Sequence, residues 1–234
     1  MTELELRTHF VDTARSYYGA EKGSAGHLDI LNIYNSQKKL PRGYKMTVND
    51  PWCATFVSAM AIKCGLTKII PAECSCSKMI ELHKALGTWQ EYDDYVPEPG
   101  DLILYDWDDN GKGDNTGSPA HIGIVVRVTS GLIRVIEGNL YSSVWHRDIK
   151  VDGMKIRGYC VPNFAALSEK EVKTMFEDVK KDAWYAKSVE KAAELGLMLG
   201  LSEKEFGVGQ PVTREQLATV LVRLYDKLNK EGTK

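Results

Sequence analysis

The sequence of 234 residues has no apolar stretch long enough to span a bilayer, and its acidic N-terminus lacks the basic start and apolar run of a secretory signal. We therefore expect synthesis in a cytoplasm without a signal peptide, no membrane span, and release by another route if the protein acts outside the cell. A strong charge of either sign is also missing. The formal net charge of -2 gives no long-range attraction to nucleic acid, so no nucleic-acid partner is expected.

Cysteine is scarce and follows no regular spacing. The five cysteines are Cys53, Cys64, Cys74, Cys76 and Cys160. An odd number without a framework argues against a disulfide scaffold. The pair at positions 74 and 76 lacks the two-residue gap and the second pair of a structural zinc site, so both are interpreted as ordinary loop thiols.

The hydrophobic pattern changes its period along the chain. Apolar residues recur at helical spacing over residues 3–18, 27–36, 53–64 and 77–86, the last with Ser77 as its expected cap. Short β-branched runs follow at 101–105, 121–128, 132–137, 144–149 and 157–161, with a hairpin turn at Ser130-Gly131. Helices followed by an antiparallel sheet predict an α+β fold.

A second domain is expected after this unit. We assign residues 1–164 to the first domain, the charged segment 165–174 to a linker, and residues 175–234 to a small all-α helical hairpin. Thr213 and Gln216 form the pattern of a capping box that begins the last helix.

Cys53 is the strongest candidate nucleophile. It follows Pro51 at the expected start of an apolar helix, where the positive end of the helix dipole favours the thiolate form of cysteine. His121 opens one strand and Glu137 closes its hairpin partner, so the two side chains are expected to meet across the sheet. Asn139 lies two residues beyond Glu137 and shares its face if the strand continues.

These residues together support acyl transfer. His121 and Cys53 would form an imidazolium–thiolate pair, and Glu137 would fix the imidazole tautomer. Asn139 would orient that pair or donate to an oxyanion. Gly123, on the His121 side of its strand, is expected to leave space for a substrate backbone. Taken alone, Cys53 could be a core thiol, His121 a structural histidine, and residues 137–139 a turn. The joint placement of these residues argues against those interpretations.

Four segments around these residues resemble the CHAP family of cysteine, histidine-dependent amidohydrolases and peptidases. They are residues 50–57, 99–103, 121–125 and 137–139. The resemblance spans roughly residues 2–164 and implies a papain-like fold and cleavage of bacterial peptidoglycan. It also implies that Cys53 is the nucleophile and His121 the base, with Glu137 and Asn139 completing a site that requires no cofactor for its chemistry. A related peptidase family commonly has a histidine as its third residue, so Glu137 favours the CHAP group.

The tail resembles a single S-layer homology (SLH) repeat, carried by residues 176–179, 184–200 and 211–218. Such repeats bind secondary cell-wall polysaccharides, and the resemblance makes Arg214 the expected glycan contact. The family commonly strings three repeats into one unit, whereas one is found here. We therefore expect one of two arrangements: a homo-oligomer in the form of a trimer, or packing of the tail on its own catalytic domain. Light scattering on the intact chain distinguishes the two.

An acidic loop before His121 has the start of a calcium-binding loop. Asp106, Asp108 and Asn110 alternate as oxygen ligands, and Asp114 falls where a ninth-position ligand would. Gly117 stands where the closing glutamate belongs, so a solvated acidic loop is the competing interpretation.

The combined prediction is a peptidoglycan hydrolase, either an N-acetylmuramoyl-L-alanine amidase or a stem or cross-bridge endopeptidase, with a wall-binding module. Without a signal peptide, such a bacteriolytic enzyme is expected to be an endolysin of a phage or prophage. Two alternatives remain: a cysteine peptidase or acyltransferase that acts on protein, and a wall-binding protein without catalytic activity.

Overall fold

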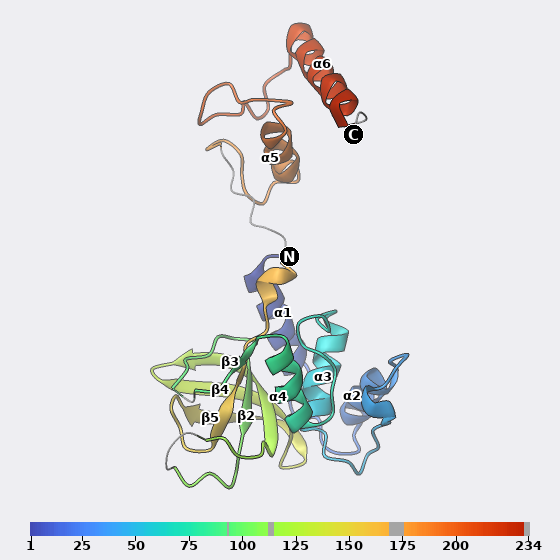
Figure 1. The fold of residues 1–234 in the computed structure, drawn as a ribbon, viewed down its shortest axis with the longest axis vertical. Helices are drawn as coiled ribbons and strands as arrows, with labels where there is room; N and C mark the ends of the chain where they lie inside the picture. The colour runs from blue at the N-terminus through green and yellow to red at the C-terminus, as the bar shows by residue number, and fades with distance from the viewer. Residues whose placement is uncertain (93, 112–114, 169–175, 232–234) are drawn as a thin grey trace. The chain divides into compact units, whose positions relative to one another are not determined.

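The computed structural model describes residues 1–92, 94–111, 115–168 and 176–231. The chain divides into two compact units, Met1–Glu169 and Lys170–Lys234 (Figure 1). The expected linker, 165–174, lies mostly outside the described residues. Its described part begins within a short 3-10 helix, Phe164–Ala166. None of the described helices combines the length and apolarity needed to cross a bilayer.

Four helices precede the main strands of the first unit, as the periodicity predicts. They are α1 (Glu3–Arg15), α2 (Ala25–Asn35), α3 (Cys53–Lys63) and α4 (Cys76–Ala85). Thr2 begins α1 with a capping box formed with Glu5. The expected cap of α4 was wrong: Ser75, not Ser77, accepts a hydrogen bond from the N–H of Lys78 and begins the helix two residues earlier.

The strands form one antiparallel sheet of six strands in the order β1-β6-β2-β3-β4-β5. Their bounds are β1 (Trp89–Gln90), β2 (Leu102–Tyr105), β3 (His121–Thr129), β4 (Leu132–Leu140), β5 (Ser143–Lys150) and β6 (Ile156–Cys160). Thr129 pairs with Leu132 across the turn at Ser130-Gly131, where both turn residues have positive φ. Helices followed by an antiparallel sheet confirm the α+β prediction, whereas the short β1 was not predicted.

Helix α3 is the centre of the first unit, since its side chains from Cys53 to Ala61 are all buried. It packs against β3 and β4, and Figure 1 shows the helices gathered beside the sheet. The approach to β4 is close: a Cβ on Gly138 would lie 2.4 Å from Cβ of Phe56 and 3.0 Å from the Trp52 ring. Only glycine fits there, so Gly138 brings the end of β4 against the first turn of α3.

The free edge of β5 is covered by the connection between α1 and α2. The N–H groups of Gly19 and Lys22 donate to the carbonyls of Val144 and Ser142, and the Val144 N–H donates to Ala20. Glu21 also forms an isolated antiparallel bridge with Ser143. The backbone groups of β5 that would otherwise face solvent are thus partly paired within the chain.

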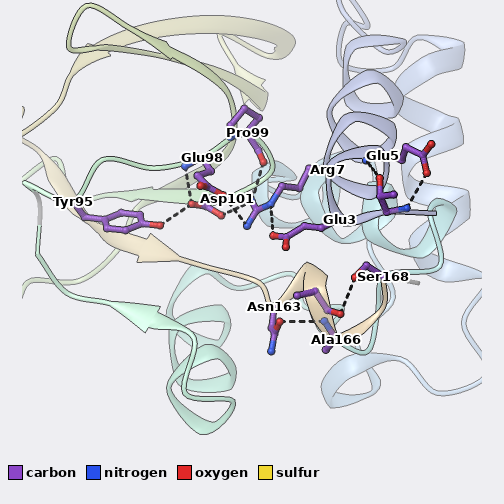
Figure 2. A network of polar contacts seen from close by, with 12 residues as sticks. Glu3, Glu5, Arg7, Tyr95, Glu98, Pro99, Asp101, Asn163, Ala166 and Ser168 are labelled. Carbon is purple, nitrogen blue, oxygen red and sulfur yellow. Dashed lines mark hydrogen bonds and ion pairs between the residues drawn. The ribbon is translucent and has the colours of Figure 1, made fainter. Parts of the chain in front are cut away.

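A polar network joins α1 to the start of β2 (Figure 2). The Arg7 guanidinium donates to Asp101 Oδ1 and to the Pro99 carbonyl, each at 3.0 Å. The other oxygen of Asp101 accepts from the Tyr95 hydroxyl at 3.1 Å and from the Glu98 N–H at 2.9 Å. Asp101 is fully buried, and burial raises its pKa although these hydrogen bonds act in the opposite direction.

The second unit is all-α in its described residues, with α5 (Ala186–Glu194) and α6 (Arg214–Glu231). Thr213 and Gln216 form the predicted capping box: the Thr213 N–H donates to Gln216 Oε1, and the Gln216 N–H donates to Thr213 Oγ1. The Asp178 carboxylate ties the loop between the helices by accepting the N–H groups of three successive residues, 206–208. A small core forms around Phe176, Val179, Ala186 and Val189.

We expect Arg7→Met to lower the free energy of unfolding of the first unit by about 3–5 kcal/mol, because it leaves Asp101 buried without its cationic partner. Urea denaturation measures this change. Arg15→Met is the matched control, since Arg15 on the same helix pairs with the exposed Asp12 and should cost less than about 1 kcal/mol. Equal losses in the two variants would contradict a structural role for the network.

Candidate active site

Cys53 is the first residue of α3, as predicted, and its side chain is buried with 6% exposure. Trp52 precedes the helix without a side-chain cap. The hydrogen-bond ladder of α3 begins where the Phe56 N–H donates to the Trp52 carbonyl, so the N–H groups of residues 53–55 lie outside it. These N–H groups give the thiol the positive end of the helix dipole.

The surroundings of Cys53 favour its thiolate. A hydrogen bond from Cys76, whose sulfur lies 3.8 Å from that of Cys53, is the largest influence, and burial opposes it. Hydrogen bonding and charge from His121, with the Ala54 N–H, act in the same direction as Cys76, and together they hold the pKa of Cys53 well below its ordinary value. The structure therefore brings Cys53 and His121 together, as predicted.

His121 and Glu137 meet across the β3–β4 hairpin, as predicted, but a register shift between Val125 and Arg127, which was not predicted, puts their side chains on one face. Nε2 of His121 lies 2.9 Å from Oε2 of the fully buried Glu137. A carboxylate only accepts, so Nε2 carries the hydrogen and Nδ1 is the nitrogen left for the thiol. Burial lowers the pKa of His121, but hydrogen bonds and charges from Cys53 and Glu137 outweigh this effect and raise the pKa to about 9.

Arg147 on β5 is a site residue that sequence reasoning missed. Its Nε and Nη2 donate to the two oxygens of Glu137 at 2.8 and 3.1 Å, and its guanidinium lies over the rings of Tyr105 and Trp107. Burial raises the pKa of Glu137, but hydrogen bonds from His121 and Arg147 hold it below its ordinary value. The signal in the sequence is weak, since an arginine on an edge strand is most often a solvated side chain.

Asn139 lines a cavity of about 310 Å³ together with Trp107, His121, Leu140, Tyr141 and Arg147. The strand does not continue regularly to Asn139: its φ is 59°, and the β4–β5 register shifts between Glu137 and Leu140. Simple alternation therefore does not place Asn139 on the face of Glu137. The shift turns this end of β4 into one wall of the cavity.

Gly123 has a different role from the expected one. A Cβ at this position would lie 2.5 Å from Cγ1 of Val135 and 2.6 Å from Cγ of Glu137. The space beside Gly123 is thus filled by side chains of β4 rather than left for a substrate backbone. The glycine instead lets Glu137 lie flat across β3 toward His121.

The structure describes three of the four predicted calcium ligands. Asp106 is buried and accepts the Asp108 N–H, and the neighbouring Asp109 accepts N–H groups from Gly111 and Lys155. Asp114 lies outside the described residues. Within the part of the chain that is described, no three acidic, histidine or cysteine side chains form a group able to hold a metal ion. Calcium binding by Asp106, Asp108, Asn110 and Asp114 stays a prediction.

Arg214 is the first residue of α6, and its side chain is exposed. It is not among the residues that line the cavity of about 820 Å³ in the second unit, which is bordered by Trp184, Tyr185, Phe206, Val212, Gln216 and Arg223 among others. This cavity is larger than the one beside His121, but no thiol or imidazole borders it, so it is not a site for acyl transfer.

Two family profiles match the chain. Residues 43–139 match the CHAP domain, and residues 176–218 match the S-layer homology domain. The first range contains Cys53, His121, Glu137 and Asn139, and ends before Arg147. The chain therefore combines one segment that matches a CHAP domain with a second segment that matches an SLH domain.

Two curated proteins are similar to part of this chain. A "Cell surface protein" of Thermoanaerobacter kivui is 45% identical over 51 residues, 22% of this chain and 7% of that protein. A "Surface-layer 125 kDa protein" of Lysinibacillus sphaericus is 38% identical over 64 residues, 27% of this chain and 5% of that protein. The chain thus spans less than a tenth of the length of these two relatives.

A solved structure described as "The crystal structure of Ly7917" aligns over 67% of this chain and 62% of that chain at 12% identity. Its TM-score of 0.34 is too low to support any inference about this protein.

We expect Glu137→Gln to lower the pKa of His121 by about one to three pH units, because the variant removes a hydrogen-bonded carboxylate that favours the imidazolium. NMR titration of the imidazole measures the change. Asp148→Asn is the control, since it removes an exposed β5 carboxylate whose partner is Arg134. An unchanged His121 pKa in the Glu137 variant would show that the pair does not act as one unit.

Proposed function

We propose that this protein hydrolyses an amide bond in bacterial peptidoglycan by a thiolate mechanism, as an N-acetylmuramoyl-L-alanine amidase or a stem or cross-bridge endopeptidase. The observation that carries the proposal is the placement of Cys53, His121 and Glu137 in one hydrogen-bonded series within the segment that matches the CHAP domain. The SLH domain on the same chain supports a substrate in the cell wall rather than a free protein.

In the first step, the Cys53 thiolate attacks the carbonyl carbon of the amide. The resulting oxyanion lies near the start of α3, where the Cys53 N–H is outside the helical ladder and is available to donate to it. The His121 imidazolium then gives its Nδ1 proton to the leaving amine, and an acyl-enzyme remains. A pKa of about 9 keeps His121 charged at neutral pH, which suits its role as this acid.

In the second step, neutral His121 takes a proton from water, and the hydroxide releases the acyl group from Cys53. Glu137 holds the Nε2–H throughout and stabilises the imidazolium each time it forms. Arg147 holds Glu137 ionised and in place through two hydrogen bonds. Asn139 borders the cavity where the substrate would enter, and there it would orient the reacting amide.

The proposal extends to binding and to biological role. Arg214, exposed at the start of α6, would contact a secondary cell-wall polysaccharide, since a guanidinium recognises anionic or hydroxyl-rich glycans with paired hydrogen bonds. A hydrolase joined to a wall-binding domain fits a bacteriolytic enzyme of the endolysin type.

Apolar side chains exposed along α6 also favour a homo-oligomer formed through the second unit: Leu217, Leu221, Val222, Leu224, Tyr225 and Leu228.

Cys53→Ala should reduce the release of soluble fragments from purified cell walls by at least about a thousandfold, because the nucleophile is removed, while sedimentation with the walls persists. Cys64→Ala, which removes a thiol that contacts Thr13 instead, is the matched control. Mass spectrometry of the fragments names the bond that is cut. Undiminished fragment release by Cys53→Ala would exclude the thiolate mechanism, and cleavage of protein substrates but not walls would favour the peptidase alternative.

Arg214→Ala should weaken binding to polysaccharide-bearing walls by about tenfold, the effect of losing one charge-assisted interaction. Binding to walls stripped of secondary polysaccharide should be equally weak in variant and parent. Lys227→Ala removes an exposed positive charge from the same helix and should bind like the parent. Identical losses in both variants would point to general charge attraction rather than a contact made by Arg214.

A further inference from the structure

We propose that Cys76 is a resolving thiol for Cys53: hydrogen peroxide oxidises the nucleophile, and the two sulfurs then join in a disulfide that reversibly blocks the active site. The switching of catalysis rests on the proposed function, whereas formation of the bond does not. Cys76 contacts Cys53 at the starts of two helices and takes no part in the bond-making steps of hydrolysis.

The two thiols face each other from equivalent positions. Cys53 is the first residue of α3 and Cys76 is the first residue of α4, and their sulfurs lie 3.8 Å apart. A disulfide needs a separation of about 2.0 Å, so side-chain rotation and a small local shift are enough to form the bond. Both side chains are buried, and Cys76 is the thiol that the structure places beside Cys53.

The position of Cys76 is fixed by the turn that precedes α4. The Glu73 carboxylate accepts the N–H groups of Cys74 and Ser75 and a hydrogen bond from Arg42. The backbone of Glu73 is in turn held by Ser58 of α3: the Ser58 hydroxyl donates to the Glu73 carbonyl at 2.6 Å and accepts its N–H at 2.8 Å. The start of α4 is thus anchored to the helix that carries the nucleophile.

The protonation states suit the two different roles. Cys53 is held as a thiolate, whereas the hydrogen bond to Cys53 and then burial raise the pKa of Cys76 well above its ordinary value. Cys53 is therefore the sulfur that reacts with an oxidant, and Cys76 keeps a proton that it can release later. The remaining thiols are placed differently: Cys64 contacts Thr13, Cys74 contacts Arg42, and Cys160 is fully buried.

The reaction balances with hydrogen peroxide as the oxidant. The Cys53 thiolate attacks one peroxide oxygen and breaks the O–O bond, which gives a sulfenic acid at Cys53 and, after protonation of the leaving hydroxide, one water. The Cys76 sulfur then attacks the Cys53 sulfur and displaces hydroxide, which takes the Cys76 proton and leaves as a second water. Two thiols are oxidised, one peroxide is reduced to two waters, and a dithiol reductant reverses the change.

The experiment treats the full chain with peroxide and follows two independent readouts. Intact mass and peptide mapping report the bond, which lowers the mass by two hydrogen atoms and links the peptides of Cys53 and Cys76. Release of wall fragments reports the loss and recovery of activity. For the parent and for each variant, it is measured relative to the untreated sample of the same protein. We expect the parent to lose nearly all activity and to regain it with dithiothreitol.

Two variants make the test specific. Cys76→Ser keeps a hydrogen-bond donor beside Cys53 but cannot form the bond, so its Cys53 should proceed to the sulfinic acid, and dithiothreitol should restore at most about a tenth of its activity. Cys64→Ser should oxidise and recover like the parent. The absence of a linked Cys53–Cys76 peptide, or equal recovery by the parent and Cys76→Ser, would overturn the proposal. If no variant hydrolyses walls before oxidation, the proposed function fails, while the mass readout still decides whether the bond forms.

Discussion

The close packing of β4 on the first turn of α3 is the constraint on which the site depends. Gly138 has no room for a side chain between β4 and the residues Trp52 and Phe56. These two residues flank Cys53, and Glu137 immediately precedes the glycine. One contact between the backbone of β4 and helix α3 therefore sets the separation between Cys53 and Glu137. It links the stability of the core to the geometry of the proposed active site.

Charge within the site alternates in a series that begins at the helix and ends at the outer strand. The Cys53 thiolate faces the His121 imidazolium, which faces the Glu137 carboxylate, which is held by the Arg147 guanidinium. Each group is buried enough that an unpaired charge would be costly, and each has an opposite charge as its neighbour. The series favours a thiolate at Cys53 beside an imidazolium at His121.

The parts of this site that the sequence predicts are those determined by local signals. The start of α3 places Cys53, and the two-residue turn at Ser130-Gly131 brings His121 and Glu137 to the same end of one hairpin. The register shift between Val125 and Arg127, which puts His121 and Glu137 on one face, has no such local signal. Arg147 and Cys76 depend on the register of β5 and on the path of the turn before α4, which non-local contacts decide. Residues 75 and 77 are both serines, and the hydrogen bonds that the N–H groups of Cys74 and Ser75 donate to the Glu73 carboxylate help to fix which one begins the helix.

The strand that supplies Arg147 lies at the edge of the sheet, where exposed backbone groups readily recruit other extended chains. Residues 19–22 occupy one end of that edge by pairing with Ser142 and Val144. An added strand could therefore pair only with the remaining part of β5, 145–150, which is the part that carries Arg147.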